Sequence, residues 1–187
     1  MKFTQTEIPD VIIIEPTVFS DERGWFMESF NKDRFCKELK NLSLNAPEDF
    51  VQDNHSVSKK GVLRGLHYQI SPHAQGKLVR VVEGAAFDVA VDLRKDSETY
   101  LKWIGVELSK NNKKMLWIPE GFAHGFLALE DNTQFLYKTT NYYNPESERS
   151  LLWNDERLNI RWPAIELINI SAKDACAPNI LSLEGEG

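Results

Sequence analysis

Short apolar segments recur along the chain, and within most of them apolar and polar side chains alternate. In Ala86–Leu93, Phe87 and Val89 fall on one face of an extended chain, while Asp88 and Ala90 fall on the other. The same pattern predicts strands at Val11–Glu15, Gly61–Ile70, Lys77–Glu83, Trp103–Leu108, Met115–Ile118, His124–Leu129 and Gln134–Thr140. Many short strands separated by turn residues are typical of an antiparallel sandwich or barrel, and a jelly roll is one such fold.

One convincing helical pattern occurs, near Asn31–Leu42. Asn31 can cap this helix, and Phe35, Leu39 and Leu42 recur at the spacing of one helix face. The pattern as a whole therefore predicts an all-β protein with one or two short helices.

The length of 187 residues suits one domain, so we expect a single domain over residues 1–187. N-terminal segments such as Val11–Ile14 are apolar, and as sheet edges they would need cover from a partner subunit. The segment after Trp162 contains prolines and small residues, and we expect it to wrap around the outside of the domain.

The formal net charge of −6 argues against a surface that binds nucleic acid, where basic stripes are expected. No segment approaches the roughly 20 apolar residues of a membrane span, and the first residues lack the apolar run of a signal peptide. The two cysteines, Cys36 and Cys176, match neither a metal motif nor a disulfide framework. These features predict a cytoplasmic protein with reduced thiols.

Five titratable side chains lie within apolar, strand-like segments: Arg64, His67, Lys77, His124 and Tyr137. Any one of them alone would be read as a hydrogen-bonded group of the core, because buried polar groups need partners. All five together are better explained by a polar cavity at the mouth of a barrel.

Arg64 and His67 are three residues apart, so a regular strand would direct them to opposite faces. For both of them, and for Gln69, to project into the cavity, the strand must be irregular. We therefore expect a bulge or bend near Gly65.

The polar residues of this cavity suit one type of reaction. His67 can act as a general base near neutral pH, and Lys77 can stabilise a developing oxyanion. Tyr137 can deliver a proton from another direction. A base, an oxyanion stabiliser and a separate acid suit proton abstraction next to a carbonyl followed by reprotonation. Racemases, epimerases and isomerases of this kind need no cofactor.

The fold resembles the cupin jelly rolls, which often bind a metal through a His-x-His pair, a following Glu and a later His. Pro119–His124 matches the second of the two cupin patterns, but Gln69 stands where the second histidine of the first pattern would be. Two histidines are too few for a typical metal site, so we expect no metal.

The motifs resemble those of the dTDP-4-dehydrorhamnose 3,5-epimerase family over nearly the whole chain. The matching segments, in order, are DERGWFMESF (Asp21–Phe30), RGLHYQ (Arg64–Gln69), AQGKLVRVVEG (Ala74–Gly84), DVAVDLR (Asp88–Arg94), IPEGFAHGF (Ile118–Phe126), YKTTNYY (Tyr137–Tyr143) and SAKDACAP (Ser171–Pro178). The resemblance implies a homodimeric, metal-independent cupin-type jelly roll that inverts carbons 3 and 5 of dTDP-4-dehydro-6-deoxyglucose. The product would be the precursor of dTDP-L-rhamnose.

The resemblance also implies the roles of individual residues. His67 would be the general base, and Asp174 the carboxylate that orients it. Tyr137 would be the general acid on the opposite face. Lys77 would stabilise the enolate, with His124 close by. The other implied substrate-binding residues are Arg23, Glu28, Gln52, Asn54, Arg64 (for the pyrophosphate), Tyr143 (stacking on the thymine), Glu148 and Lys173.

Three other functions remain open at this point. A relative on the same scaffold could invert only carbon 3 or only carbon 5 of a related nucleotide sugar, although Tyr137 and the His67–Asp174 pair favour the double epimerase. A non-catalytic sugar-nucleotide-binding cupin would be expected to lack the base or the acid. A metal-dependent cupin oxygenase would contain a metal, and Gln69 argues against this function.

Overall fold

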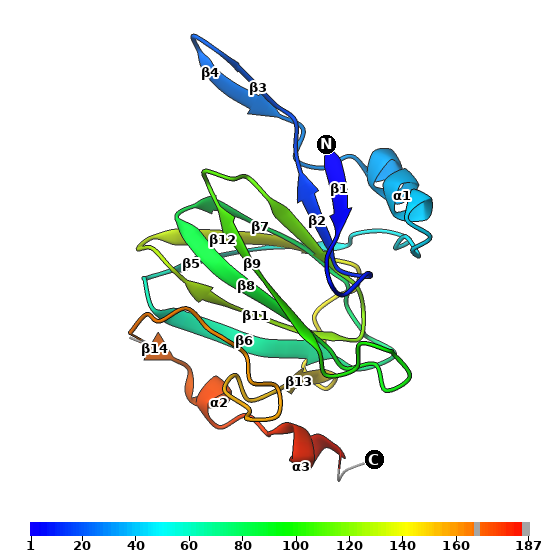
Figure 1. The fold of residues 1–187 in the computed structure, drawn as a ribbon, viewed down its shortest axis with the longest axis vertical. Helices are drawn as coiled ribbons and strands as arrows, with labels where there is room; N and C mark the ends of the chain where they lie inside the picture. Colours follow the sequence, from blue (N-terminus) through cyan, green and yellow to red (C-terminus); the bar gives the residue numbers. More distant parts are fainter. Residues whose placement is uncertain (167–168, 185–187) are drawn as a thin grey trace.

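Two antiparallel β-sheets face each other in the computed structural model, which describes residues 1–166 and 169–184 (Figure 1). In sheet 1 the strand order is β1 (Lys2–Gln5), β2 (Ile12–Glu15), β10 (Met115–Ile118), β7 (Lys77–Glu83), β12 (Thr133–Thr139) and β5 (Gln52–Ser58). In sheet 2 it is β13 (Glu148–Ser150), β6 (Val62–Gln69), β11 (Phe122–Ala128), β8 (Ala85–Asp92) and β9 (Trp103–Ser109), with β14 (Asn169–Ile170) parallel to β6. The prediction of an all-β, antiparallel jelly-roll fold is confirmed.

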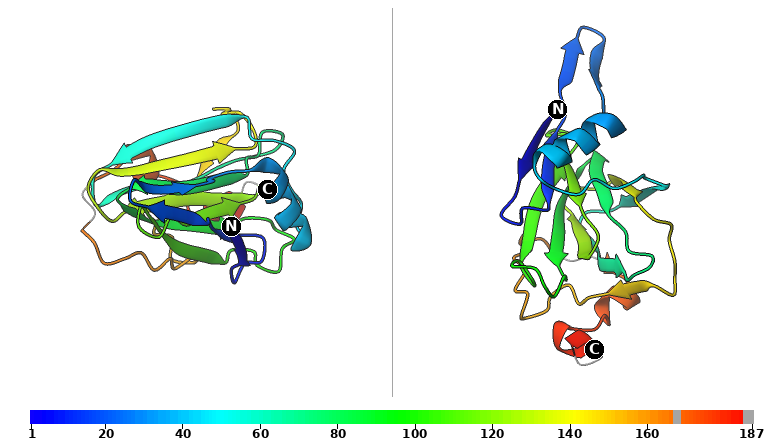
Figure 2. Two further views of the ribbon diagram at one scale, coloured as in Figure 1. Left: turned by 90° about the horizontal axis from the view of Figure 1, so that it is seen from above. Right: turned by 90° about the vertical axis from the view of Figure 1, so that its right-hand side faces the viewer.

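A two-stranded hairpin projects from one end of the sandwich. It consists of β3 (Val18–Asp21) and β4 (Gly24–Met27), whose ladder joins neither large sheet within the described residues (Figures 1 and 2). Phe19, Trp25 and Phe26 on this hairpin are 62%, 59% and 69% exposed, respectively. The hairpin therefore carries apolar side chains that the rest of the chain leaves largely uncovered.

The expected helix is present as α1 (Lys32–Asn41), and the Asn31 side chain accepts a hydrogen bond from the backbone N–H of Arg34. Phe35 and Leu39 of α1 are buried against the outer face of sheet 1. The structure adds two helical segments after residue 170, α2 (Ala172–Ala175) and α3 (Ile180–Glu184). Both are too short for a helical repeat to be visible in the sequence. No helix among the described residues is long and apolar enough to cross a membrane.

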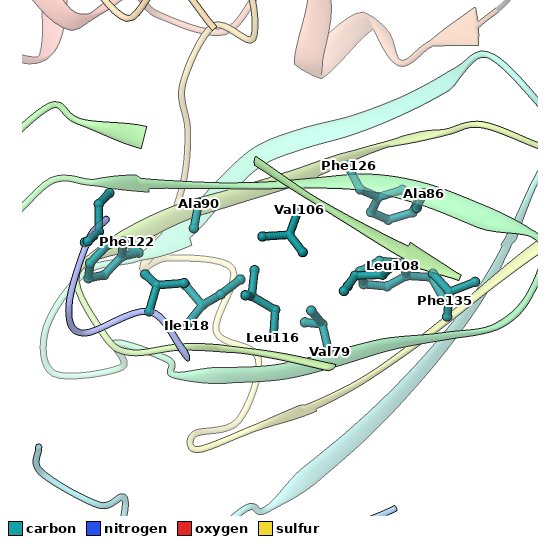
Figure 3. Close-up of a cluster of buried hydrophobic side chains, with 13 residues drawn as sticks. Val79, Ala86, Ala90, Val106, Leu108, Leu116, Ile118, Phe122, Phe126 and Phe135 are labelled. Carbon is teal, nitrogen blue, oxygen red and sulfur yellow. The ribbon is translucent and has the colours of Figure 1, made fainter. Parts of the chain in front are cut away.

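The main core lies between the two sheets, as Figure 3 shows. Its buried side chains come from both layers: Val79, Val81, Leu116, Ile118 and Phe135 from sheet 1, and Ala86, Ala90, Val106, Leu108, Phe122 and Phe126 from sheet 2. Phe126 and Phe135 stack across the gap with ring centroids 4.1 Å apart. This contact closes the interior behind the cavity described below, because both rings also line that cavity.

Strand β8 directs its acidic face inward and its large apolar face outward. Ala90 belongs to the core between the sheets, whereas Val89 and Val91 belong to a second cluster with Ile180 of α3. The alternation of β8 was visible in the sequence. That its large apolar face is also buried follows from the C-terminal segment, which packs against the outer side of the sheet.

Two hydrogen bonds, each donated by a backbone N–H, hold this C-terminal segment against the sandwich. The N–H of Leu152 donates to the carbonyl of Pro178 (2.9 Å), and the N–H of Ile180 donates to the buried carboxylate of Asp155 (2.7 Å). Residues 185–187, the end of the tail expected to wrap around the domain, and residues 167–168 lie outside the described residues.

The argument for a partner subunit that rested on Val11–Ile14 as an uncovered sheet edge is wrong. Val11–Ile14 was expected to form an uncovered sheet edge. In the structure β2 pairs with β1 on one side and with β10 on the other. The first strand of the same chain therefore covers it, and its apolar side chains are buried against α1 and within the core.

The expected irregularity at Gly65 is confirmed. In the ladder between β6 and β11, His67 pairs with His124 and Arg64 pairs with Phe126, so β6 contains one more residue than β11 over this stretch. Gly65 has φ +124°, and a Cβ placed there would lie 2.5 Å from the Cα of Gly125. The extra residue allows both Arg64 and His67 to line the same cavity.

We expect Gly65→Ala to lower the free energy of unfolding by about 2–3 kcal/mol more than Gly24→Ala does. Both glycines have nearly the same φ, +124° and +127°, but a Cβ at Gly24 would have no neighbour within 4 Å. The difference between the variants therefore isolates the clash with Gly125 from the strain of the backbone conformation. Urea denaturation of the two variants measures it, and equal losses of stability would contradict the expectation.

Candidate active site

A cavity of about 970 Å³ is lined by residues from both sheets and from α2. The structure brings together in it eleven of the thirteen residues expected at a functional site. These eleven are Gln52, Asn54, Arg64, His67, Lys77, His124, Tyr137, Tyr143, Glu148, Lys173 and Asp174. Residues from six strands, one loop and α2 thus meet at one place. The sequence predicted this meeting for the five polar side chains that lie within apolar segments.

His67 and Asp174 form a hydrogen-bonded pair, with 2.6 Å between Nε2 and Oδ1. The other carboxylate oxygen of Asp174 accepts the backbone N–H of Gly65 at 3.3 Å, and Asp174 is only 3% exposed. Ser171 caps α2 by accepting the N–H of Asp174. Because β14 pairs with β6 immediately before this helix, the local fold delivers Asp174 to the strand that carries His67.

This pair favours His67 as a base. A carboxylate only accepts hydrogen bonds, so the hydrogen lies on Nε2 and the lone pair of the neutral ring lies on Nδ1. Burial lowers the pKa of His67 below its usual value, and the hydrogen bond and charge of Asp174 partly oppose that effect. The imidazole is therefore neutral at pH 7 and able to accept a proton.

Lys77 and His124 lie beside this pair and are almost fully buried, at 8% and 7% exposure. The Nζ of Lys77 donates to the carbonyl of His67 (3.2 Å), and the Nε2 of His124 donates to Asp88 (2.8 Å). Burial lowers the pKa of Lys77 to about 8, against the opposing charges of Asp88 and Glu148. At pH 7 Lys77 is protonated and offers a positive charge with little competing water.

Tyr137 approaches the cavity from the other layer. It lies on β12 of sheet 1, whereas His67 lies on β6 of sheet 2. Burial raises the pKa of the Tyr137 phenol, although the charge of Arg64 opposes this. The phenol therefore keeps its proton at neutral pH and can donate it, from the side of the cavity opposite the base.

The remaining polar residues form a hydrogen-bonded rim. The backbone N–H of Tyr143 donates to Gln52, the phenol of Tyr143 donates to Glu148 (3.0 Å), and Lys173 forms an ion pair with Glu148 (2.6 Å). Burial raises the pKa of Glu148, but its bonds to Lys173 and Tyr143 outweigh this and hold the pKa below its usual value. The Tyr143 side chain remains 55% exposed and presents an aromatic surface.

Arg64 is held near this rim by sheet 1. Its Nε donates to the hydroxyl of Ser58 (3.1 Å) and its Nη2 to the carbonyl of Val57 (3.3 Å). These two bonds orient the guanidinium, whose planar fork matches the oxygen atoms of a phosphate.

Two expected binding residues, Arg23 and Glu28, do not line this cavity. Arg23 lies in the turn of the β3–β4 hairpin, where it forms an ion pair with the neighbouring Asp21, and its side chain is 86% exposed. Glu28 follows β4 and accepts a hydrogen bond from Asn31. Within a single chain, both side chains therefore lie outside the cavity that holds the other eleven expected residues.

Sequence reasoning assigned no role to Asp88, and for Gln69 it expected only that the side chain projects into the cavity, where it does lie. Asp88 was recognised only as the acidic face of a strand, but the structure buries it completely against His124. Gln69 is 5% exposed, donates to the carbonyls of His73 and Tyr142, and accepts the N–H of Asn144. It therefore shapes the loop that carries Tyr143. Their position inside apolar strands was the signal that could have identified both.

The described residues contain no group of three or more His, Cys, Asp and Glu side chains that could hold a metal ion. Cys36 and Cys176 are both free thiols, one half-buried and the other exposed.

Comparison with known proteins matches residues 5–182 to the family model of dTDP-4-dehydrorhamnose 3,5-epimerase. The dTDP-4-dehydrorhamnose 3,5-epimerase of Salmonella typhimurium is 59% identical over 174 residues, which cover 93% of this chain and 92% of the relative. A solved epimerase of Legionella pneumophila in complex with dTDP-4-keto-L-rhamnose has a TM-score of 0.90 at 50% identity, covering 97% of this chain and 93% of that one.

A more distant structure, a 3'-monoepimerase from Streptomyces bikiniensis in complex with dTDP-quinovose, also has a TM-score of 0.90, at 30% identity. It covers 98% of this chain and 90% of that one. The matches extend over nearly the whole chain, and they include the segments that form the cavity. The chain therefore belongs to the dTDP-4-dehydrorhamnose 3,5-epimerase family.

Proposed function

We propose that this protein inverts carbons 3 and 5 of dTDP-4-dehydro-6-deoxy-D-glucose and releases dTDP-4-dehydro-L-rhamnose. The observation that carries the proposal is the arrangement of His67 and Asp174 on one side of a single cavity and Tyr137 on the other. Inversion of a carbon centre needs a base on one face and an acid on the opposite face, and two residues on facing sheets satisfy this need.

Each inversion begins with loss of a proton next to the 4-keto group. Nδ1 of His67 takes the proton from the carbon. The electron pair of the C–H bond becomes the carbon–carbon double bond of an enolate, and the negative charge moves onto the keto oxygen of the sugar. Asp174 stabilises the imidazolium that results. The ammonium of Lys77 and the ring of His124 then face the negative charge that grows on the keto oxygen.

The second half of each inversion returns a proton from the other side. Tyr137 donates its phenolic proton to the opposite face of the same carbon, and the enolate returns to a ketone. The tyrosinate and the imidazolium exchange protons with solvent before the next step. The same residues serve carbon 5 after carbon 3, or the reverse, because both carbons flank the same keto group.

The rim of the cavity suits the nucleotide part of the substrate. We assign Arg64 to the pyrophosphate and the exposed ring of Tyr143 to stacking on the thymine. Gln52, Asn54, Glu148 and Lys173 supply further hydrogen bonds in this region.

The ionisation of Lys77 predicts the alkaline limit of the reaction. With a pKa of about 8 rather than the usual 10.5, Lys77 is charged below pH 8 and neutral above it. We expect kcat to fall as the pH rises through about 8, because the charge that stabilises the enolate is then lost. Measurement of kcat between pH 6 and pH 10 tests this. In Lys77→Arg, whose guanidinium stays charged over this range, the fall near pH 8 should disappear. An unchanged alkaline limb in that variant would contradict the assignment.

Proton NMR of dTDP-4-dehydro-6-deoxyglucose incubated with the protein in deuterated water tests the function itself. Deuterium entering at both carbons 3 and 5, with formation of the L-rhamno product, supports the double epimerase. Deuterium at one carbon only would support the second candidate, a single-site epimerase, which the likeness to a 3'-monoepimerase keeps under consideration. No exchange at either carbon would overturn both.

We further propose that the protein is a cytoplasmic homodimer in which the β3–β4 hairpin packs against a second copy. The exposed aromatic side chains of the hairpin need such cover. The hairpin also carries Arg23, and Glu28 follows it, so docking would let both binding residues reach the cavity of the other copy.

Light scattering tests the dimer. We expect a dimer mass for the wild-type protein, and a monomer with weaker dTDP binding for Trp25→Ser combined with Phe26→Ser. Leu181→Ser, which removes an equally exposed apolar side chain from α3, should leave both properties unchanged. A monomeric wild-type protein would refute this arrangement.

A further inference from the structure

Asp88 is a fully buried carboxylate directly beneath the cavity. It lies on β8 between Ala86 and Ala90, whose side chains point into the core between the sheets (Figure 3). It is 0% exposed and is not itself among the residues that line the cavity. Burial of a carboxylate at such a depth is costly unless its oxygens are paired.

Only one of these oxygens is paired. Oδ2 of Asp88 accepts the Nε2–H of His124 at 2.8 Å, whereas Oδ1 has no hydrogen-bond partner among the described residues. A purely structural carboxylate is expected to have both oxygens satisfied. Asp92, four residues further along β8 and on the same face, shows this: its two oxygens accept hydrogen bonds from Arg94, Ser97 and Thr99.

A short series of contacts connects Asp88 to the positive charge of Lys77. Asp88 binds His124, and His124 pairs across the strands with His67. The carbonyl of His67 in turn accepts a hydrogen bond from the Nζ of Lys77. Asp88 is also the charge that most strongly opposes the effect of burial on the Lys77 ammonium.

We propose that Asp88 is a positioning residue for the site of the developing oxyanion: its carboxylate fixes the ring of His124 through Nε2 and its negative charge keeps Lys77 protonated. This inference rests on the proposed function, and it adds to that function the group that maintains the charge facing the keto oxygen. Asp88 touches no substrate in this account and acts only through His124 and Lys77.

Other charged groups also face Lys77 and have to be held constant in a test. The titratable and charged side chains that line the cavity with Lys77 are His55, Lys59, Arg64, His67, Tyr68, His124, Tyr137, Tyr143, Glu148, Lys173 and Asp174, and Asp88 lies outside this lining. Of the carboxylates among them, Glu148 is ion-paired with Lys173 and Asp174 is hydrogen-bonded to His67. Among these described carboxylates, Asp88 is the one with a buried oxygen that has no hydrogen-bond partner.

The test compares Asp88→Asn with Asp92→Asn in the intact protein, using the deuterium-exchange assay and kcat as a function of pH. The asparagine oxygen can still accept the Nε2–H of His124, so Asp88→Asn removes mainly the charge. We expect kcat at pH 7.5 to fall about threefold or more, because lowering the alkaline limb from about pH 8 by roughly one pH unit reduces the protonated fraction of Lys77 at pH 7.5 from about three quarters to about one quarter. The affinity for dTDP, measured by calorimetry, should stay within about threefold of the wild-type value, because the rim is untouched.

Asp92→Asn is the matched control for burial, since Asp92 is equally inaccessible on the same strand and face. It should lower the melting temperature but leave the pH of the alkaline limb unchanged. An alkaline limb that stays at the wild-type pH in Asp88→Asn, while the wild-type protein is active, would overturn the role of Asp88 and leave the proposed function intact. A wild-type protein that exchanges no deuterium would instead refute the proposed function.

A second variant covers the case in which Asp88→Asn alone does not fold. Asp88→Asn combined with Lys77→Met removes both charges, so neither is left buried without the other. The proposal requires this double variant to recover folded protein where Asp88→Asn alone does not fold, or to melt at a higher temperature where both fold. A double variant that is no more stable than Asp88→Asn would overturn it.

Discussion

His67→Ala is expected to abolish deuterium entry at both carbon 3 and carbon 5 and to lower kcat by about 10²- to 10⁴-fold, the range for loss of a general base. We expect no other histidine of the cavity to replace it. His124 also has a carboxylate partner, Asp88, but in the proposed scheme its ring faces the keto oxygen and not the carbon that loses the proton. His55, which also lines the cavity, is hydrogen-bonded through Nε2 to Gln134. Both carbons should lose exchange together, because one base serves both.

The fold and the nucleotide site should survive this change. The His67 side chain is only partly buried, and its loss leaves the rim residues in place. Calorimetry with dTDP should therefore give a near wild-type affinity. His73→Ala is the control, since His73 binds Ser147 outside the cavity and should retain exchange. Residual exchange at one carbon in His67→Ala would indicate a second base and contradict the single-base scheme.

Tyr137→Phe should separate two events that are coupled in the wild-type protein. His67 can still remove a proton and return a deuteron to the same face, so deuterium should continue to enter the substrate. Formation of the inverted product should fall by about 10²-fold or more, because no group remains to protonate the opposite face. The ratio of exchange to inversion, read from NMR coupling constants, should therefore rise sharply.

Tyr142→Phe provides the control for this experiment. Tyr142 is 64% exposed and lies outside the cavity, and the same loss of a hydroxyl should leave both exchange and inversion unchanged. If exchange and inversion fall by the same factor in Tyr137→Phe, Tyr137 acts in the first proton transfer or in binding. Its role as the opposite-face acid would then be wrong.

The strands were predictable where one side of a segment is apolar. Lys77–Glu83 and Met115–Ile118 have the same bounds in sequence and structure, because both are buried between neighbours in sheet 1. Strand β5, Gln52–Ser58, was missed because its sequence QDNHSVS is almost wholly polar. It is an edge strand with the cavity on one face and solvent on the other, so neither face requires apolar side chains.

The catalytic chemistry was partly predictable from the residues alone. Polar side chains inside apolar segments identified His67, Lys77 and Tyr137, because such positions carry a cost that needs an explanation. Asp174 was reached only through the resemblance to a known family. It lies 107 positions after His67, in a segment with no strand pattern, and its pairing depends on a tertiary contact that local sequence does not encode.

The burial of Asp88 was not predicted. An acidic residue that alternates with large apolar ones is normally read as facing solvent. Here the apolar face of β8 is the outer one, covered by the C-terminal segment, and the acidic face is the inner one. The periodicity of a strand identifies its two faces, but which face is enclosed depends on what packs against each.

The position of Asp174 near the end of the chain also sets an order in time. A ribosome making this protein emits every strand of sheet 1 and most of the cavity lining before it emits α2, which carries Asp174. The anchor that holds this helix, through Pro178 and Ile180, emerges later still. Proton abstraction by an oriented His67 therefore has to wait for α2, and products truncated upstream of this helix should be unable to turn substrate over.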